Sequence, residues 1–124
     1  MIWELYEIEY YKDKNGYSQI AEWIEELKKG YSNNKNKRVQ LKQFITKINY
    51  IEELGTRGNK DTIKHIVEDI WEIRPGDNRV LLFTYINDKI ILLHQFRKEG
   101  QKTPKQEIER AKRERNDWIE RNGL

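Results

Sequence analysis

A row of cations lies at the ends of apolar runs in residues 71–104, WEIRPGDNRVLLFTYINDKIILLHQFRKEGQKTP. Apolar runs separated by turn residues predict strands, and side chains placed where neighbouring strands begin or end can meet at one edge of a sheet. The cations are Arg74, Arg79, Arg97, Lys98 and Lys102. Several cations at one edge suit a ligand with several negative charges, so the segment predicts a phosphate-handling site.

The two arginines of the segment could hold one phosphate between them. Arg74 and Arg79 flank one turn and could close on the same phosphate, because a guanidinium binds two phosphate oxygens at once. Lys98 and Lys102, after the last strand, would complete the clamp.

His94 is the candidate proton donor, because imidazole exchanges protons near neutral pH. Its alternation with Ile90, Leu92 and Phe96 places it on an apolar face of the sheet, where a buried structural histidine is the alternative. Arg97 alternates away from His94 and would contact the RNA backbone or ribosomal RNA. The sequence leaves the role of His94 open.

Ion pairing is the other interpretation of the two arginines. Glu72 alternates onto the face of Arg74 and could act as a base, but a plain ion pair between the two is the simpler arrangement. Arg79 could pair in the same way with Asp77, and lysines in loops are commonly solvated.

The elements that must position these residues follow from periodicity and turn residues. Residues 2–10 alternate as a strand, and helical spacing predicts one helix from a cap at Ser18 to Gly30 and a second that stops at Gly55. A polar loop at 32–36 makes the two a hairpin. The later part of 63–73, residues 79–86 and residues 89–96 predict three antiparallel strands, with turns at 74–78 and 87–88.

A final helix is predicted to run to about Asn122. Thr103 would be its N-cap, Pro104 its first residue and Gln106 the partner that completes a capping box. Its apolar residues are few, so it should pack along one narrow stripe or await a partner. They are Ile108, Ala111, Trp118 and Ile119.

This order of elements predicts an α+β fold: two N-terminal helices and a C-terminal helix packed on a mostly antiparallel four-stranded sheet. We expect the helices to cover one face and to leave the other face, or its rim, for ligand. The 124 residues show no repeat or linker, which predicts a single domain over residues 1–124.

Composition narrows the chemistry and the location. The sequence has no Cys and only two His, so we expect no cofactor and no metal site. No apolar run approaches the roughly 20 residues that span a membrane, and acids occupy the N-terminal stretch where a signal peptide carries bases. We therefore expect a soluble, cytoplasmic protein without a membrane partner.

The charge is uneven, although the net value is only +3. Residues 1–27 carry two bases and seven acids, whereas residues 28–47 carry seven bases and no acid. The basic run of Lys35, Lys37, Arg38 and Lys42 is either a solvated helix face or a contact to ribosomal RNA.

Several short motifs, in their order and spacing, resemble one family. They are WEIR at residues 71–74, the turn at Gly76, Arg79-Val80, LLHQF at residues 92–96 and QKTP at residues 101–104. Together they resemble the phage-derived HigB branch of the RelE-type toxins of the RelE/ParE superfamily. The similarity is sharp over about residues 63–112 and looser before them.

The resemblance implies a RelE-like fold and the toxin of a type II toxin-antitoxin system, an mRNA interferase that cuts messenger RNA, typically on the translating ribosome. It implies catalytic roles for Arg74, Arg79, Lys98 and Lys102 in cleavage by transesterification. That reaction needs a deprotonated 2′-OH, a stabilised phosphorane dianion and a protonated leaving oxygen, and fixed cations with a proton donor can supply these without a metal. Its partner would be a HigA-like helix-turn-helix antitoxin, with operator DNA bound only through the complex. Some relatives use a Tyr in the last helix, and this helix has none.

Two other functions use the same cations. One is a non-catalytic RNA- or DNA-binding module, for which loss of one arginine would weaken binding modestly. The other is a degenerate toxin that only represses its own operon together with its antitoxin.

Overall fold

The computed structural model describes residues 5–86 and 88–123, which form three helices and a five-stranded mixed sheet. The α+β class is therefore confirmed. In chain order the elements are β1 (Glu7–Tyr10), α1 (Gln19–Lys29), α2 (Lys35–Leu54), the 3-10 turn η1 (Gly55–Arg57), β2 (Ile63–Val67), β3 (Ile70–Ile73), β4 (Asn78–Tyr85), β5 (Lys89–Arg97) and α3 (Lys105–Asn122).

The strand order is β1-β5-β4-β3-β2, and only the β1–β5 pair is parallel. The prediction of four strands is wrong, because residues 63–73 form a hairpin of β2 and β3. The turn between them contains neither Gly nor Asn, and Glu68 has a φ of 51°. Arg115 of α3 holds this turn, with Nη1 2.8 Å from Glu68 and 2.6 Å from Asp69. Contacts distant in sequence thus stabilise a turn that local signals do not predict.

The other strands lie close to their predicted positions. β4 and β5 differ by one residue at their ends from the ranges expected, and β1 occupies the later part of the predicted 2–10 strand. Residues 2–4 and Asn87, part of the predicted turn at 87–88, lie outside the described residues.

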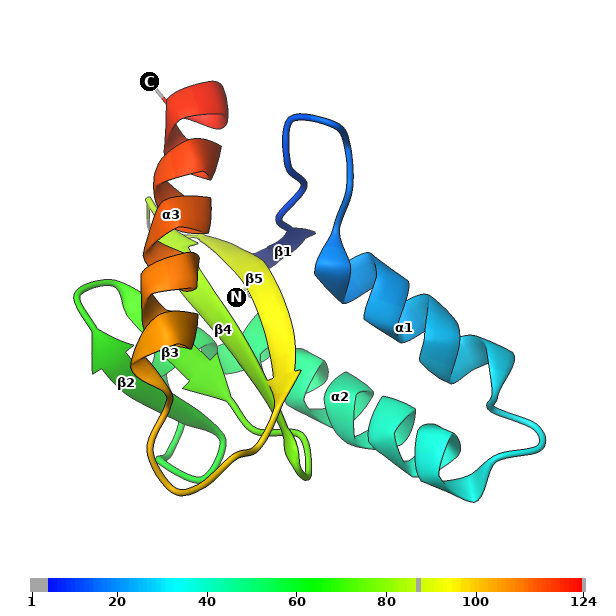
Figure 1. The fold of residues 1–124 in the computed structure, drawn as a ribbon. Helices are drawn as coiled ribbons and strands as arrows, with labels where there is room; N and C mark the ends of the chain where they lie inside the picture. The colour runs from blue at the N-terminus through cyan, green and yellow to red at the C-terminus, as the bar shows by residue number, and fades with distance from the viewer. Residues whose placement is uncertain (1–4, 87, 124) are drawn as a thin grey trace.

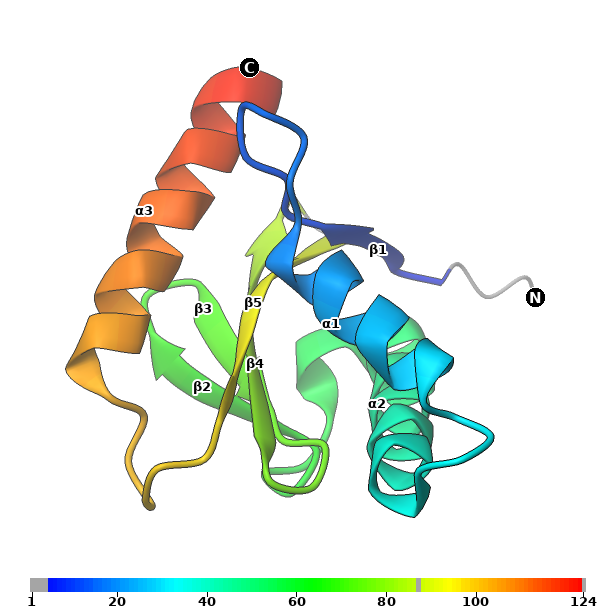
Figure 2. The same ribbon diagram turned by 45° about the vertical axis from the view of Figure 1, so that its right-hand side comes forward.

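Helices cover both faces of the sheet (Figure 1). In Figure 2 the sheet stands between α3 on one side and the α1–α2 hairpin on the other. The expectation of a free face is therefore wrong, and of the two alternatives only a ligand at the rim of the sheet stays a prediction. Both faces are covered because β4 is apolar on both. Val80 and Leu82 pack toward the hairpin, while Leu81 and Phe83 pack toward α3. Strands apolar on both faces need cover on both.

The helical hairpin forms as its caps predict. The Ser18 hydroxyl accepts a hydrogen bond from the backbone N of Ala21, and α1 ends at Gly30. Gly55 ends α2. Trp23 and Phe44 meet edge to face with ring centroids 5.2 Å apart, which fixes α1 on α2.

α3 has the predicted narrow stripe, but a different start. Ala111 and Trp118 are its buried residues, and Trp118 lies edge to face with Phe83. Pro104, not Thr103, is the N-cap residue, and no side chain caps this end. The Thr103 hydroxyl instead bonds a side chain of β3. Among the described residues, no helix has the length and apolar character to cross a membrane.

Candidate functional site

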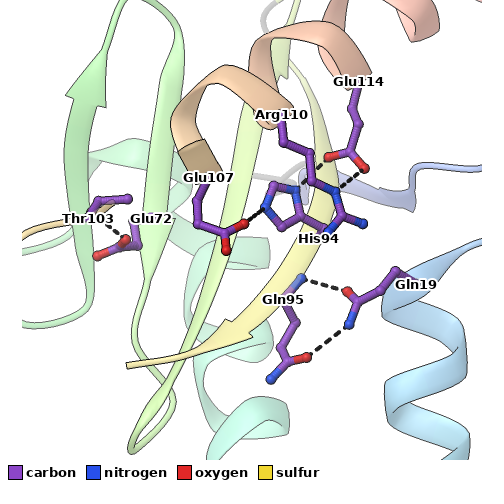
Figure 3. Close-up of polar contacts among 8 residues, drawn as sticks. All are labelled: Gln19, Glu72, His94, Gln95, Thr103, Glu107, Arg110 and Glu114. Atoms are coloured by element: carbon purple, nitrogen blue, oxygen red, sulfur yellow. Dashed lines mark hydrogen bonds and ion pairs between the residues drawn. The ribbon is translucent and has the colours of Figure 1, made fainter. Parts of the chain in front are cut away.

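A buried carboxylate joins the two arginines of the β3–β4 turn. Glu72, with a fully buried side chain, has Oε1 2.7 Å from Nε of Arg74 and 3.9 Å from Nε of Arg79. Its other oxygen, Oε2, accepts the Thr103 hydroxyl at 2.7 Å, shown in Figure 3. The predicted pairing of Glu72 with Arg74 is thus present, and it extends to Arg79.

The two arginines differ in what they can offer a ligand. The Arg79 side chain is only 9% exposed, and its Nη1 donates to the carbonyls of Gly76 and Asn78. Burial, together with the charge of Arg74, lowers the pKa of the Arg79 guanidinium. The Arg74 side chain is 28% exposed and bonds Glu72 through Nε. Arg74 is therefore the more accessible of the two.

The loop between β5 and α3 is tied to the β3–β4 turn at its start and to β3 at its end. At its start the backbone N of Lys98 donates to the carbonyl of Asp77 at 2.8 Å. At its end Thr103 bonds Glu72. Lys98 and Lys102 are exposed, and within the described part of the chain neither ammonium has a carboxylate within 4.0 Å. The backbone of this loop is thus anchored next to the β3–β4 turn at Lys98 and next to Glu72 at Thr103. That Lys98 and Lys102 act with Arg74 stays a prediction.

A β-bulge places His94 on the opposite face from the one its alternation predicts. Leu81 pairs with His94 but Leu82 pairs with Leu92, so Leu93 is an extra residue in β5. The residues that follow it therefore point to the opposite face of the sheet from the one that strict alternation predicts. His94 consequently faces α3 rather than the helical hairpin. The single-residue shift is set by pairing between strands, which periodicity along one strand does not show.

Both nitrogens of His94 face carboxylates of α3 (Figure 3). Nε2 lies 3.0 Å from Oε1 of Glu107, and Nδ1 lies 2.5 Å from Oε1 of Glu114. His94 itself is fully buried, and Arg110 supports Glu114 with Nε 3.3 Å from its second oxygen. The imidazole has no nitrogen free toward solvent, so this arrangement suits a link between β5 and α3.

A ladder of side-chain amides joins the hairpin to the sheet, and sequence reasoning missed it. Gln19 exchanges hydrogen bonds with Gln95, whose Nε2 donates to Asn78 at 2.8 Å. Asn78 donates in turn to Gln40 at 2.9 Å, and Arg97 donates to the same Gln40 oxygen at 3.2 Å. These residues are far apart in sequence and share no motif, so no local signal marks them.

The basic run of α2 divides between two surroundings. Lys35, Lys37 and Lys42 line hollows beside α2, and Arg97 lies across from them. The Arg38 guanidinium instead donates to the Tyr31 carbonyl and lies 5.9 Å from the centroid of the Tyr31 ring. The run is therefore not a uniform face.

The arrangement offers cations but no metal ligands in a group. Over residues 5–86 and 88–123, no three side chains of His, Cys, Asp or Glu are placed to hold an ion together. Every buried side-chain nitrogen or oxygen of these residues has a hydrogen-bond partner. The chemistry that the site supports directly is anion binding by guanidinium and ammonium groups.

A family model matches most of the chain. The family model described as phage derived protein Gp49-like (DUF891) matches residues 22–116, from α1 to most of α3. No curated protein matches the chain. The matched region contains Glu72, Arg74 and Arg79, which we call the arginine cluster, and the loop that follows β5.

Proposed function

Because the chain belongs to the phage-derived Gp49-like family, a family of RelE/HigB-type toxin-like proteins, we propose that it is the toxin of a type II toxin-antitoxin system. Within that family we assign it to the HigB branch. Its activity is that of an endoribonuclease that cleaves messenger RNA on the translating ribosome.

The observation that carries the proposal is the meeting of Arg74 and Arg79 at one buried carboxylate. Glu72 holds two like charges together at the end of the sheet, where they would otherwise repel. The loop that carries Lys98 and Lys102 is bonded to Asp77 at its start and to Glu72 at its end, which supports a role for these lysines beside the two arginines. Cations fixed before the substrate arrives stabilise a phosphorane without reorganising during the reaction.

The cleavage step needs no metal in this mechanism. The 2′-hydroxyl gives its proton to water and its oxygen attacks phosphorus, the bond to the 5′-oxygen breaks, and that oxygen takes up a proton, so a 2′,3′-cyclic phosphate and a 5′-hydroxyl result. Arg74 binds the non-bridging oxygens, and Arg79 holds the turn and adds charge. Since His94 is enclosed by carboxylates, Lys98 or Lys102 is the exposed donor for the leaving oxygen.

A small helix-turn-helix antitoxin of the HigA kind is the proposed partner. It would silence the toxin, and operator DNA would be bound only through the complex. The family membership supports this partner.

Non-catalytic RNA binding is the second candidate. The enclosure of Arg79 and His94 favours it, since neither group is widely exposed to a substrate. Under this alternative, loss of Arg74 would weaken RNA binding and there would be no cleavage to lose.

Induced expression in bacteria, with and without the neighbouring small open reading frame, tests the proposal. We expect the chain alone to arrest growth and to create new 5′ ends within translated messages, and co-expression of the antitoxin to prevent both. The Arg74→Ala, Arg79→Ala variant should lose both effects, whereas Arg113→Ala, at an exposed residue of α3, should keep them. Wild-type expression without arrest or new ends would refute the nuclease function.

A further inference from the structure

Three adjoining hollows run along α2 from Lys35 to Lys47. The first, of about 570 Å³, lies between Gln40, Gly76 and Arg97. A second of about 440 Å³ continues past Gln43 to Arg74, and a third of about 490 Å³ continues the other way to the end of α1. Neighbouring hollows share lining residues, so they form one depression, which we call the α2 groove.

Positive charge dominates the α2 groove. Six cations line it, against the two carboxylates of Glu26 and Asp77. Only Arg74 among the six has a carboxylate within 4.0 Å in the described chain. The six are Lys35, Lys37, Lys42, Lys47, Arg74 and Arg97. Unpaired cations along a concave surface raise the local potential and attract a polyanion.

The floor of the groove is held in place. Gln40 accepts from Asn78 and from Arg97, and these bonds belong to the amide ladder that ties α2 to the sheet. Gly76 has a φ of +66°, a conformation that L side chains rarely adopt, and it places the β3–β4 turn beside Gln43 of α2. Hydrogen bonds that hold Gln40 and Arg97 before a ligand arrives lower the cost of ordering them on binding.

Arg74 belongs to both the groove and the arginine cluster. It lines the hollow beside Lys42 and Gln43, and it also bonds Glu72. The groove therefore leads to the proposed site of cleavage. From Lys35 to Lys47 it extends roughly 18 Å, at about 1.5 Å per helical residue.

We infer that the α2 groove binds single-stranded RNA through its phosphates, next to the phosphate that is cleaved. The inference rests on the proposed function and adds the path of the substrate. Duplex RNA fits less well, because its recognition spans about 16 base pairs, far longer than the groove. Trp23, the aromatic residue at one end, is buried, so stacking on bases plays no part and binding should tolerate many sequences.

Binding of an uncleavable RNA tests the groove separately from catalysis. A fluorescein-labelled 2′-O-methyl RNA of about 12 nucleotides, a length typical of single-strand sites, has its attacking oxygen blocked. We expect the double variant Lys35→Ala, Lys42→Ala to bind this RNA several-fold more weakly. The slope of the logarithm of the binding constant against the logarithm of the salt concentration should become shallower by about 1.4, because two phosphates of the RNA would no longer be neutralised. The matched variant Lys60→Ala, Lys64→Ala removes the same charge outside the groove and should bind as wild type does. Arg38→Ala should also bind normally.

Equal weakening by both double variants, or tighter binding of a duplex of the same length, would overturn the inference. A failure of the proposed nuclease function would give another result. The wild-type protein would then bind this RNA through Lys35 and Lys42 but would not cut messenger RNA.

Messenger and ribosomal RNA are both possible sources of the bound strand. A photo-crosslinking amino acid in place of Gln43, in toxin bound to translating ribosomes, distinguishes them. Crosslinks to the message support the inference, and crosslinks to ribosomal RNA alone contradict it.

Discussion

The hydroxyl of Thr103 donates to Oε2 of Glu72 at 2.7 Å, so the residue that looks like a helix cap instead ties the loop before α3 to β3. This bond fixes the end of the segment that carries Lys98 and Lys102. The same carboxylate holds Arg74 through its other oxygen. One side chain thus aligns the parts of the proposed phosphate site.

Replacement of Thr103 by Val should release the loop without disturbing the helix. A hydrogen bond to a charged group contributes about 1.5–3 kcal/mol, and we expect a loss of about that size in the free energy of unfolding. Amide hydrogen exchange should accelerate in residues 98–103 but not in the first turn of α3. Thr103→Ser should restore both. Faster exchange confined to the first turn of α3 would mean that Thr103 acts as a cap after all.

Glu72→Gln should destabilise the fold strongly. The substitution keeps the size of the side chain but leaves two guanidinium groups facing each other without a buried counter-charge. Loss of one partner from a buried pair costs about 3–5 kcal/mol, and the partial exposure of Arg74 places our expectation at about 3 kcal/mol by urea unfolding. Glu109→Gln, on an exposed part of α3, should change stability by less than about 0.5 kcal/mol. Equal effects of the two substitutions would show that the cluster needs no counter-charge.

His94→Gln should reduce stability more than it reduces cleavage per folded molecule. The change removes a group placed between two carboxylates, so Glu107 and Glu114 lose their shared partner, at a cost of about 2–4 kcal/mol. Unfolding curves and single-turnover cleavage, both with His65→Gln as control, measure the two effects. If His94 were the proton donor, the same substitution would slow cleavage about 10²-fold or more, the usual contribution of general acid catalysis, and would leave stability unchanged.

Alkaline pH should unfold the protein partly through Tyr11. Burial, and then the hydrogen bond to Asp117 at 2.7 Å, raise the pKa of the Tyr11 hydroxyl to about 12. Because this pKa lies above the ordinary value of 10.0, the stabilisation is complete below pH 10 and is lost as the pH rises toward about 12. The Tyr11→Phe variant should have a free energy of unfolding about 1 kcal/mol lower than that of wild type at pH 8. Between pH 10 and 12 its free energy of unfolding should fall less than that of wild type. Tyr17→Phe, at an exposed residue, should follow wild type, and parallel curves for all three proteins would contradict the assignment.

Most elements could be predicted because their signals are local. Ser18, Gly30 and Gly55 end or begin helices within one turn of themselves, and alternating or continuous apolar residues mark β4 and β5. The hairpin of β2 and β3 was missed because its turn depends on Arg115, a residue of the last helix.

The amino-acid sequence by itself determined the element types and the presence of cations at strand ends, since both depend on residues close together in the chain. Only the tertiary structure decided which groups meet. The bulge at Leu93 turns His94 toward two carboxylates, and the layer of α3 brings Thr103 to Glu72. Register between strands and packing between layers are set by contacts across the whole chain, and no local pattern records them.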